Sequence, residues 1–413
     1  MRLVLILGSL TALGPLSVDL YLPALPELTR DFGARASEGQ LTLTACLAGL
    51  ALGQLLAGPL SDRFGRRGPL LVGLVAYCAA SLACALAPSI YALVALRLLQ
   101  GFAGAAGIVI ARAVVRDVSS GVAAARLFSA LMLVFGVAPV LAPVVGGQLL
   151  HVTSWRGLFV TLALIGLPLL LATAFWLEET LPPERRGGGG WLETSRTFRR
   201  LVHDRMFVGF ALCTGCAFAA MLAYIAGSPF VVQEIYGVSP GLYGVIFGVN
   251  SLGLIVCSQL NGALVGRLGL RRLLAVGLVL GASAGSALLA IVLVGGIGLA
   301  GILPCFFVVV ASLGFVAPNA TALALADYPD VAGSASALLG VVHLLLGAAA
   351  APLVGVAGAE SAVPMAALMA AFGVAAVAAL GLSRGHVVAD AEPGPLLSVT
   401  EPYSPRRSSG PSP

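Results

Sequence analysis

Long apolar segments alternate with short polar ones along the whole chain. Each apolar segment has about 20 residues, which is the length that a helix needs to cross the hydrocarbon core of a bilayer. Helices satisfy their backbone polar groups internally, as lipid requires. The pattern therefore predicts twelve membrane-spanning helices, at residues 3–23, 40–60, 69–88, 91–114, 127–150, 156–177, 206–227, 241–262, 273–294, 297–324, 335–356 and 362–383.

The composition excludes a soluble protein. Hydrophobic residues make up 59% of the 413 residues and charged residues only 10%, whereas a soluble domain carries about 25% charged residues. All 7 cysteines fall inside apolar segments, and the Cys213–Cys216 pair has no second pair or histidine nearby. We therefore expect no disulfide framework and no metal site.

The basic residues give the expected orientation. All 23 are arginines, and sorting them by the alternating spans puts nearly all on the side of the N-terminus. Cytoplasmic loops are enriched in basic residues, so we expect a bacterial inner-membrane protein with both termini in the cytoplasm and no nucleic-acid partner. The arginines on the expected inner side are Arg2, Arg63, Arg66, Arg67, Arg112, Arg116, Arg126, Arg185, Arg186, Arg196, Arg199, Arg200, Arg205, Arg267, Arg271, Arg272, Arg384, Arg406 and Arg407. The expected outer side has Arg30, Arg35 and Arg156, and Arg97 lies within a span.

The chain divides into two similar halves. We predict a six-helix half over residues 1–178, a cytoplasmic linker over 179–205, a second half over 206–383 and a disordered tail over 384–413. The segment Gly58 to Arg67 after the second span is echoed by Gly262 to Arg271 after the eighth, and Ala142-Pro-Val-Val-Gly is echoed by Ala351-Pro-Leu-Val-Gly. Two echoes in the same order indicate an internal duplication, and paired parallel halves are a recurring transporter architecture.

Six segments carry distinctive motifs: Leu13–Pro26, Gly58–Arg67, Arg97-Leu-Leu-Gln-Gly101, Ala111–Asp117, Gly136–Gly147 and Glu178–Arg185. These motifs resemble those of the major facilitator superfamily, on its bicyclomycin/chloramphenicol resistance branch of drug:proton antiporters. The resemblance is close over spans one to six and holds only in outline beyond them. It implies an all-α fold of twelve helices in two pseudo-symmetric bundles. This chain departs from the family pattern at Ala142, where glycine is usual, and at Gly266, which replaces an acid.

Asp19 and Arg97 are the candidate proton-coupling pair. Asp19 is the only one of 18 acidic residues set well inside a span, where a charged carboxylate costs roughly 2.5–3.5 kcal/mol. A buried carboxyl favours its neutral form and can exchange a proton; alternatively, Asp19 is solvated from the outer edge of its helix. Arg97 either acts on the protonation of Asp19 or has a structural role, in which it donates hydrogen bonds to backbone carbonyls of the first helix. Gln100 shares its helix face, and Gly101 permits close helix packing.

The loop motif is predicted to be a conformational latch. Its expected members are Gly58, Asp62, Arg63, Gly65, Arg66 and Arg67, together with Asp117. The resemblance implies that Asp62 lies against the N-terminus of helix eleven, near Ser334 to Ser336, a favourable place for an acid. Arg66 is expected to reach Asp117. These links are predicted to form when the cytoplasmic ends close; simple anchoring by the arginines is the alternative.

The fifth span carries the proline and glycine residues of the antiporter motif. Prolines bend a helix and glycines allow close packing, and the resemblance ties this segment to export; a kinked packing helix is the simpler interpretation. The motif residues are Gly136, Pro139, Pro143, Gly146 and Gly147. The candidate cavity residues, which ordinary packing would also explain, are Tyr21, Met132, Phe135, Phe218, Met221, Tyr224 and Asn250.

Together these features predict a proton-coupled exporter of small amphiphilic drugs such as chloramphenicol or bicyclomycin. The expected partners are the drug, protons and the lipid bilayer, and the expected form is a monomer. The proton gradient would be the energy source, without a cofactor. A metabolite carrier on the same fold is the alternative, because fold does not fix substrate. A membrane enzyme or receptor is disfavoured, since no nucleophile–base pair, metal cluster or extramembrane domain is found. No Walker A loop is found either, which disfavours ATP as the energy source.

Overall fold

The computed structural model describes residues 2–119, 121–186, 198–328, 331–355, 358 and 360–383. Within those ranges the chain is helical and contains no β-strand. Among the described residues, twelve helical segments are long and apolar enough to cross a membrane, which confirms the predicted all-α membrane fold. Residues 187–197 of the predicted linker and the predicted tail from residue 384 lie outside the described residues.

The helices follow the apolar segments in order. The first half contains α1 (Arg2–Asp19), α2 (Leu25–Asp31), α3 (Ala36–Phe64), α4 (Arg67–Ala85), α5 (Ile90–Val118), α6 (Gly121–Leu149) and α7 (Trp155–Trp176). The second contains α9 (Arg205–Phe230), α10 (Pro240–Leu268), α11 (Leu270–Val294), α12 (Leu299–Leu325), α13 (Ala332–Val354) and α14 (Val363–Leu382). Short 3₁₀ turns lie at η1 (Leu22–Ala24) and η2 (Pro183–Arg185), and η3 (Val231–Ile235) is a π-helical turn that extends α9.

The first span differs from its predicted form. The predicted segment 3–23 is an unbroken helix, whereas the structure has a helix that ends at Asp19, turns through η1 and resumes as α2. The far end of α2 is fixed to α7 by Asp31, whose Oδ2 accepts hydrogen bonds from Trp155 Nε1 at 2.9 Å and Arg156 Nη1 at 2.6 Å. Hydropathy did not reveal this extension, because it depends on polar contacts beyond the apolar run.

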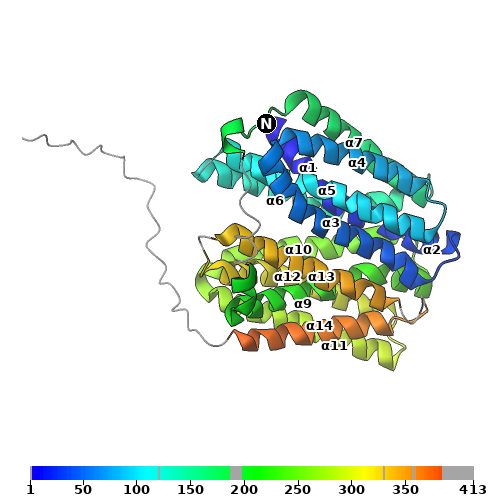
Figure 1. The fold of residues 1–413 in the computed structure, drawn as a ribbon. Coiled ribbons are helices and arrows are strands. Elements are labelled where there is room, and N and C mark those ends of the chain that lie inside the picture. Colours follow the sequence, from blue (N-terminus) through cyan, green and yellow to red (C-terminus); the bar gives the residue numbers. More distant parts are fainter. Residues whose placement is uncertain are drawn as a thin grey trace, which may run out of the picture.

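The helices pack as two groups, α1–α7 and α9–α14, which lie side by side with their helices roughly along one direction (Figure 1). We call them the N-terminal and C-terminal groups. Within the first, α5 packs against both α3 and α4; within the second, α9 packs against α13 and α14. Glycine permits the close approach of α3 and α5, because a side chain at Gly101 would overlap the Cys46 carbonyl and one at Gly53 the Phe102 carbonyl.

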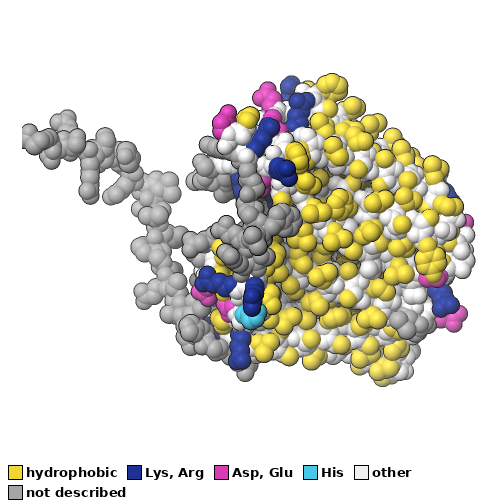
Figure 2. Space-filling view, viewed as in Figure 1, with side chains coloured by type: hydrophobic (Ala, Val, Ile, Leu, Met, Phe, Trp, Pro, Cys, Tyr) yellow, Lys and Arg dark blue, Asp and Glu magenta, His cyan; other side chains and the backbone are white. Residues whose placement is uncertain are grey.

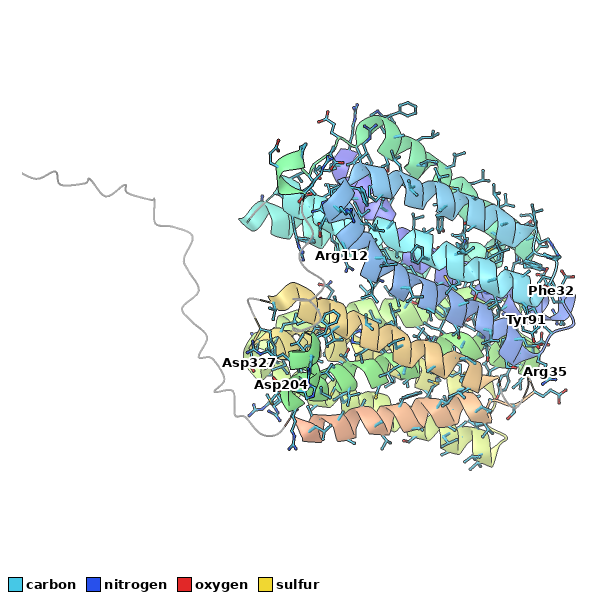
Figure 3. All side chains as sticks on the ribbon, in the orientation of Figure 1. Phe32, Arg35, Tyr91, Arg112, Asp204 and Asp327 are labelled. Carbon is cyan, nitrogen blue, oxygen red and sulfur yellow. The ribbon has the colours of Figure 1, made fainter. Side chains whose placement is uncertain are left out.

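Charged side chains gather at the two ends of the molecule, with a hydrophobic band between them on the face seen in Figure 2. One end is defined by the loops after α3 and α10, and we call it the arginine-rich end. Its arginines include Arg63, Arg66, Arg67, Arg267, Arg271 and Arg272. Phe32, Arg35 and Tyr91 lie at the opposite end, whereas Asp204 and Asp327 lie at the arginine-rich end (Figure 3).

The hydrophobic core joins the two groups at only one end. At the opposite end and towards the middle, the largest cluster combines Leu22 and Leu43 of the N-terminal group with Val231 and Val354 of the C-terminal group. A second cluster, around Trp155 of the N-terminal group, includes Phe230 of α9. At the arginine-rich end, the described residues form two separate clusters. One, around Leu70 and Val114, belongs wholly to the N-terminal group, and the other, around Phe210 and Leu274, belongs wholly to the C-terminal group. The groups are therefore packed together at one end and apart at the other.

The two copies of the loop motif share their backbone and one contact. Gly65 and Gly269 occupy matching positions and both have positive φ, +92° and +77°, a conformation that favours glycine. In the first copy, Arg67 Nη2 donates to the Ala174 carbonyl of α7 at 2.5 Å. In the second, Arg271 Nη2 donates to the Ser383 carbonyl just after α14 at 3.0 Å. Each group thus ties its motif loop to the end of its own last helix.

Candidate functional site

Arg97 is a fully buried cation in the middle of the N-terminal group. Its Nη2 donates to the Ser17 carbonyl of α1 at 2.9 Å, and its Nη1 donates to Gln100 Oε1 at 2.5 Å. Its guanidinium also lies over the Tyr21 ring, 4.2 Å from the centroid, a favourable cation–π arrangement. Arg97 therefore bridges α5 and α1, as the structural alternative for this residue predicted.

Four residues that the sequence interpretation missed extend this network. Gln100 Nε2 donates to Ser81 Oγ at 2.7 Å, the Ser17 and Tyr77 hydroxyls are 2.8 Å apart, and the Tyr21 hydroxyl lies 3.1 Å from Thr42 Oγ1. The polar contacts reach from α5 to α4, from α1 to α4, and from Tyr21 in the turn after α1 to α3. Buried networks of this kind fix the positions of the helices that share them. A polar residue inside an apolar span was the available signal for all four: Ser17, Thr42, Tyr77 and Ser81.

Asp19 lies where α1 ends, and it differs from Arg97 in having no hydrogen bond to any described residue. Its exposed fraction is 5%, and no ion pair joins it to Arg97 within the described ranges. Its neighbour Val18 belongs to the hydrophobic cluster that joins the two groups, and the Asp19 charge acts on Cys46 of α3 as well as on Tyr224 and Tyr243 of the C-terminal group. An enclosed carboxyl without a polar partner is costly when charged, so proton uptake or a bound ligand would stabilise it.

A second polar cluster lies in the C-terminal group, in the hydrophobic core that also contains Val18 beside Asp19. Asn250 Nδ2 donates to the Tyr224 hydroxyl at 2.9 Å, and the hydroxyls of Tyr243 and Ser228 are 3.1 Å apart. The Tyr224 ring stacks on Phe247 with a centroid distance of 5.5 Å. Hydroxyl and amide groups set among aromatic faces can hold an amphiphilic molecule by both its polar and its apolar parts.

The predicted cavity residues are only partly brought together. Tyr224 and Asn250 lie in one cluster, whereas Tyr21 belongs to the Arg97 network. Phe218 stacks on His343 of α13, with centroids 5.6 Å apart. Phe135 is half-buried on α6 and Met221 is half-buried on α9. The side chain of Met132 lies outside the described residues.

His343 lies inside α13, within a membrane span. Its Nε2 is buried and has no hydrogen-bond partner within the described part of the chain. It packs between α13 and α9, close enough to Gly215 to contact a side chain placed there. Stacking on Phe218 accounts for the position of the ring, so the structure gives His343 a packing partner and leaves its polar edge unused.

The loop motif forms its contacts inside the N-terminal group. Arg66 Nε donates to Asp117 Oδ2 at 2.8 Å, and Arg66 Nη1 bonds to Asp62. The predicted approach of Arg66 to Asp117 is therefore present, but the expected condition for it was wrong. The pair exists although the two groups are apart at the arginine-rich end, because both residues belong to one group. Asp62 is half-exposed. The side chains of residues 332–334 at the start of α13 lie outside the described residues, so the contact of Asp62 with the N-terminus of that helix stays a prediction.

Glu179 completes this loop, and the sequence interpretation gave it no role. Its Oε1 accepts the Arg66 backbone N–H at 2.8 Å and its Oε2 accepts that of Arg67 at 3.2 Å, so it caps the N-terminus of α4. Burial alone would raise the pKa of the Glu179 carboxyl. The hydrogen bonds from Arg66, Leu181 and Arg67 outweigh that effect and hold the pKa below its usual value.

The glycines of the antiporter motif have distinct positions on α6. A side chain at Gly146 would overlap the Leu20 carbonyl, within the N-terminal group, and one at Gly147 would come 2.5 Å from the Pro240 carbonyl of α10, in the other group. A side chain at Gly136 would meet nothing within 4 Å. Pro139 and Pro143 lie inside α6, and a side chain at Gly244 of α10 would overlap the Pro143 carbonyl. The motif therefore forms part of the junction between the two groups.

Polar contacts between the groups reinforce that junction at the same end. Within the described ranges, four hydrogen bonds join the groups, and all lie at the end opposite the arginine-rich end or in the adjoining turns. They are Gln233 Nε2 to the Pro23 carbonyl at 3.1 Å, Arg30 Nη1 to Glu234 at 2.9 Å, Gln40 Nε2 to the Ala226 carbonyl at 3.1 Å and Thr44 Oγ1 to the Ala348 carbonyl at 3.2 Å. Among the described residues, no group of three potential metal ligands occurs.

Comparison with known proteins agrees with this architecture. A family model described as Major Facilitator Superfamily matches residues 7–352. An uncharacterised transporter of that type, YdgK of Bacillus subtilis (strain 168), is 42% identical over 390 residues, which cover 94% of this chain and 96% of that protein. A bicyclomycin resistance protein homolog of Haemophilus influenzae is 32% identical over 365 residues, which cover 88% of this chain and 91% of that protein.

Among solved structures, a bacterial homolog of the human lysosomal transporter Spinster, crystallised in an inward-facing and occupied conformation, matches with a TM-score of 0.70. The match covers 92% of this chain and 95% of that one, and at 18% identity it bears on the fold alone. The family consists of transporters, so the expectation that the chain is not an enzyme is confirmed, as is the resemblance to the drug-resistance branch. The chain is a multi-pass bacterial membrane protein that belongs to the major facilitator superfamily.

Proposed function

We propose that the protein exports small amphiphilic compounds, of the chloramphenicol or bicyclomycin kind, in exchange for protons. It acts as a monomer in the bacterial inner membrane with both termini in the cytoplasm. The named bicyclomycin-resistance relative supports the substrate class. The arginine-rich end is then the cytoplasmic end, in keeping with the enrichment of basic residues in cytoplasmic loops, and the conformation described above is open to the cytoplasm.

The observation that carries this proposal is the buried Asp19, whose carboxyl has no hydrogen bond to any described residue and whose neighbour Val18 packs in the same core as Tyr224. It lies between the two groups, where a transporter that alternates its access must bind its substrate. When the site faces the outside, Asp19 takes up a proton and releases the drug. When it faces the cytoplasm, the proton leaves and a new drug molecule binds beside the carboxylate.

The energetics of such an exchange are sufficient. One proton that moves inward down a potential of 100 mV supplies about 2.3 kcal/mol, and each pH unit adds about 1.4 kcal/mol. With one proton for each neutral substrate molecule, the two together sustain an outward concentration ratio of several hundredfold. No cofactor is needed for this step.

The test is a drug-resistance panel in a bacterial host that lacks its own efflux pumps. Wild type, Asp19→Asn and the control Glu27→Gln, which changes a carboxyl nearer the end of the same span, are compared at matched membrane expression. We expect wild type and the control to confer resistance that an uncoupler abolishes, and Asp19→Asn to confer none. Resistance that survives Asp19→Asn would exclude Asp19 as the proton site. Absence of resistance to every compound would favour a proton-coupled metabolite carrier instead.

A further inference from the structure

A polar groove lies at the arginine-rich end of the C-terminal group, where the chain enters α9. Its volume is about 650 Å³, and it is lined by Arg199, Arg200, His203, Asp204 and Tyr328. At about 30 Å³ for each water molecule, this volume exceeds that of a phosphate group with an attached glycerol. Figure 2 shows dark blue side chains gathered beside a cyan histidine at this end, and Figure 3 places Asp204 there.

The single acid of the groove is engaged in holding the local structure. Asp204 Oδ1 accepts the Met206 backbone N–H at 2.7 Å and so caps α9, while its Oδ2 accepts the Tyr328 hydroxyl. Burial, followed by the hydrogen bond to Asp204 and its charge, raises the pKa of Tyr328 to about 12. Tyr328 therefore stays a neutral donor to Asp204 at physiological pH, and the carboxylate is kept away from the arginines.

The arginines give the groove a net positive charge. The Arg200 guanidinium lies 5.8 Å from the Tyr328 ring centroid, and no ion pair within the described ranges includes Arg199 or Arg200. His203 Nδ1 lies 2.7 Å from the Arg199 carbonyl, which holds its ring beside the two arginines. Guanidinium groups bind phosphate oxygens through paired charge-assisted hydrogen bonds.

The groove also lies at the depth of lipid headgroups. Asp204 immediately precedes Arg205, with which the seventh membrane span begins, and Tyr328 follows the tenth span, which ends at Leu325. A ligand in the groove is therefore level with the membrane surface. Basic pockets between membrane helices on this side of a bilayer are suited to anionic headgroups.

We propose that this groove binds the phosphate of an anionic phospholipid, such as phosphatidylglycerol, through Arg199 and Arg200. Asp204 and Tyr328 form its wall and keep the arginines available. The proposal requires only that the protein spans a membrane, so it stands or falls separately from drug export.

Binding is tested on the purified full-length protein by native mass spectrometry with phosphatidylglycerol, phosphatidylcholine and soluble glycerol phosphate as probes. The variant Arg199→Gln/Arg200→Gln removes the two cations of the groove. The control Arg267→Gln/Arg272→Gln removes two exposed arginines from the same end of the same group. We expect phosphatidylglycerol to bind about 30-fold less tightly to the groove variant and unchanged to the control.

Tyr328→Phe keeps both arginines but frees Asp204 to pair with them, so we expect a smaller loss of phosphatidylglycerol binding. Circular dichroism before lipid addition establishes that each variant is folded. Three outcomes would overturn the proposal: equal losses in the groove and control variants, equal binding of phosphatidylcholine and phosphatidylglycerol, or binding of glycerol phosphate as tight as that of the lipid, which would assign the groove to a soluble anion.

Discussion

At the scale of single residues, two charged side chains buried within spans of the N-terminal group, Arg97 and Asp19, have opposite surroundings. Arg97 makes hydrogen bonds to Ser17 and Gln100 and stacks on Tyr21, while Asp19 has no hydrogen bond to any described residue. A buried charge with good partners fixes structure, whereas one without partners is poised to change its protonation state or bind a ligand. The pair therefore divides into a positioning residue and a candidate coupling residue.

This division predicts the effect of Arg97→Lys. Lysine keeps the charge but lacks the planar fork that reaches both partners, so a hydrogen bond worth about 1.5–3 kcal/mol is lost. We expect a clear fall in the melting temperature in detergent, with Arg63→Lys at an exposed position unchanged. A variant that melts like wild type yet no longer transports would show instead that Arg97 acts in coupling alone.

Glu179 gives a pH-dependent prediction outside the membrane. Because its pKa is held below the ordinary value of 4.5, its contribution to stability is complete above pH 4.5 and is lost as the pH falls through the lowered value. Glu179→Gln should lose about 1 kcal/mol at neutral pH and show a flatter decline in acid. Thermal unfolding from pH 7 to pH 3 measures both effects, and Glu184→Gln in the same segment is the control. Parallel curves for Glu179→Gln and wild type would contradict the capping role.

The sequence identified some of these residues and not others, for a physical reason. A charge inside an apolar run is conspicuous because lipid penalises it, so Asp19, Arg97 and Gln100 were found. Ser17 and Tyr77 were not, because a hydroxyl costs less in a span and its importance depends on what lies across the helix interface. Glu179 was missed because its partners are backbone N–H groups of a distant loop.

At the scale of elements, helix positions follow from hydropathy, and helix contacts follow from small residues. The apolar runs predicted most spans other than the first to within about four residues, because the bilayer sets the length of each helix; α6 begins and α10 ends 6 residues beyond the predicted bounds. Which helices touch depends on where glycine allows backbones to approach, as at Gly101 on α5 and Gly147 on α6. A short stretch of sequence shows where glycine lies but not which helix packs against it. The contacts between helices could therefore be identified only from the structure.

The spacing of α6 and α10 predicts different effects for two glycines of one motif. A methyl group at Gly147 would press on the Pro240 carbonyl, whereas one at Gly136 has open space. Gly147→Ala should loosen the junction between the groups and lower transport severalfold, and Gly136→Ala should transport like wild type. Drug efflux from loaded cells is the measurement. Equal activity of the two variants would show that the junction tolerates a wider spacing than the structure has.

At the scale of the whole molecule, the contacts between the groups are concentrated at one end. Apolar packing and all four described hydrogen bonds between the groups lie there or close by, while the arginine-rich end has a separate core in each group. Each group keeps its own internal contacts, including the Arg66–Asp117 pair. Rigid groups with a junction at one end suit a rocking motion about the enclosed polar site.

The Arg30–Glu234 pair tests this arrangement, because it joins the groups at the closed end. A pair exposed at the surface contributes about 0–1 kcal/mol, which is enough to shift a balanced equilibrium severalfold. We expect Arg30→Glu to speed amide hydrogen exchange in peptides over residues 22–40 and 226–240, and Arg30→Glu/Glu234→Arg to restore the slow rate. If the double variant exchanges as fast as the single one, the pair does not hold the groups together.

The paired turns at Gly65 and Gly269 bear on the ancestry of the chain. Each turn needs a positive φ, which penalises most replacements, whereas the neighbouring acid is present as Asp62 in one copy and replaced by Gly266 in the other. A single ancestral gene segment, copied and joined end to end, would keep the bend in both descendants while their side chains diverged. Backbone geometry at such turns can therefore reveal a duplication after the surrounding amino-acid sequences have diverged.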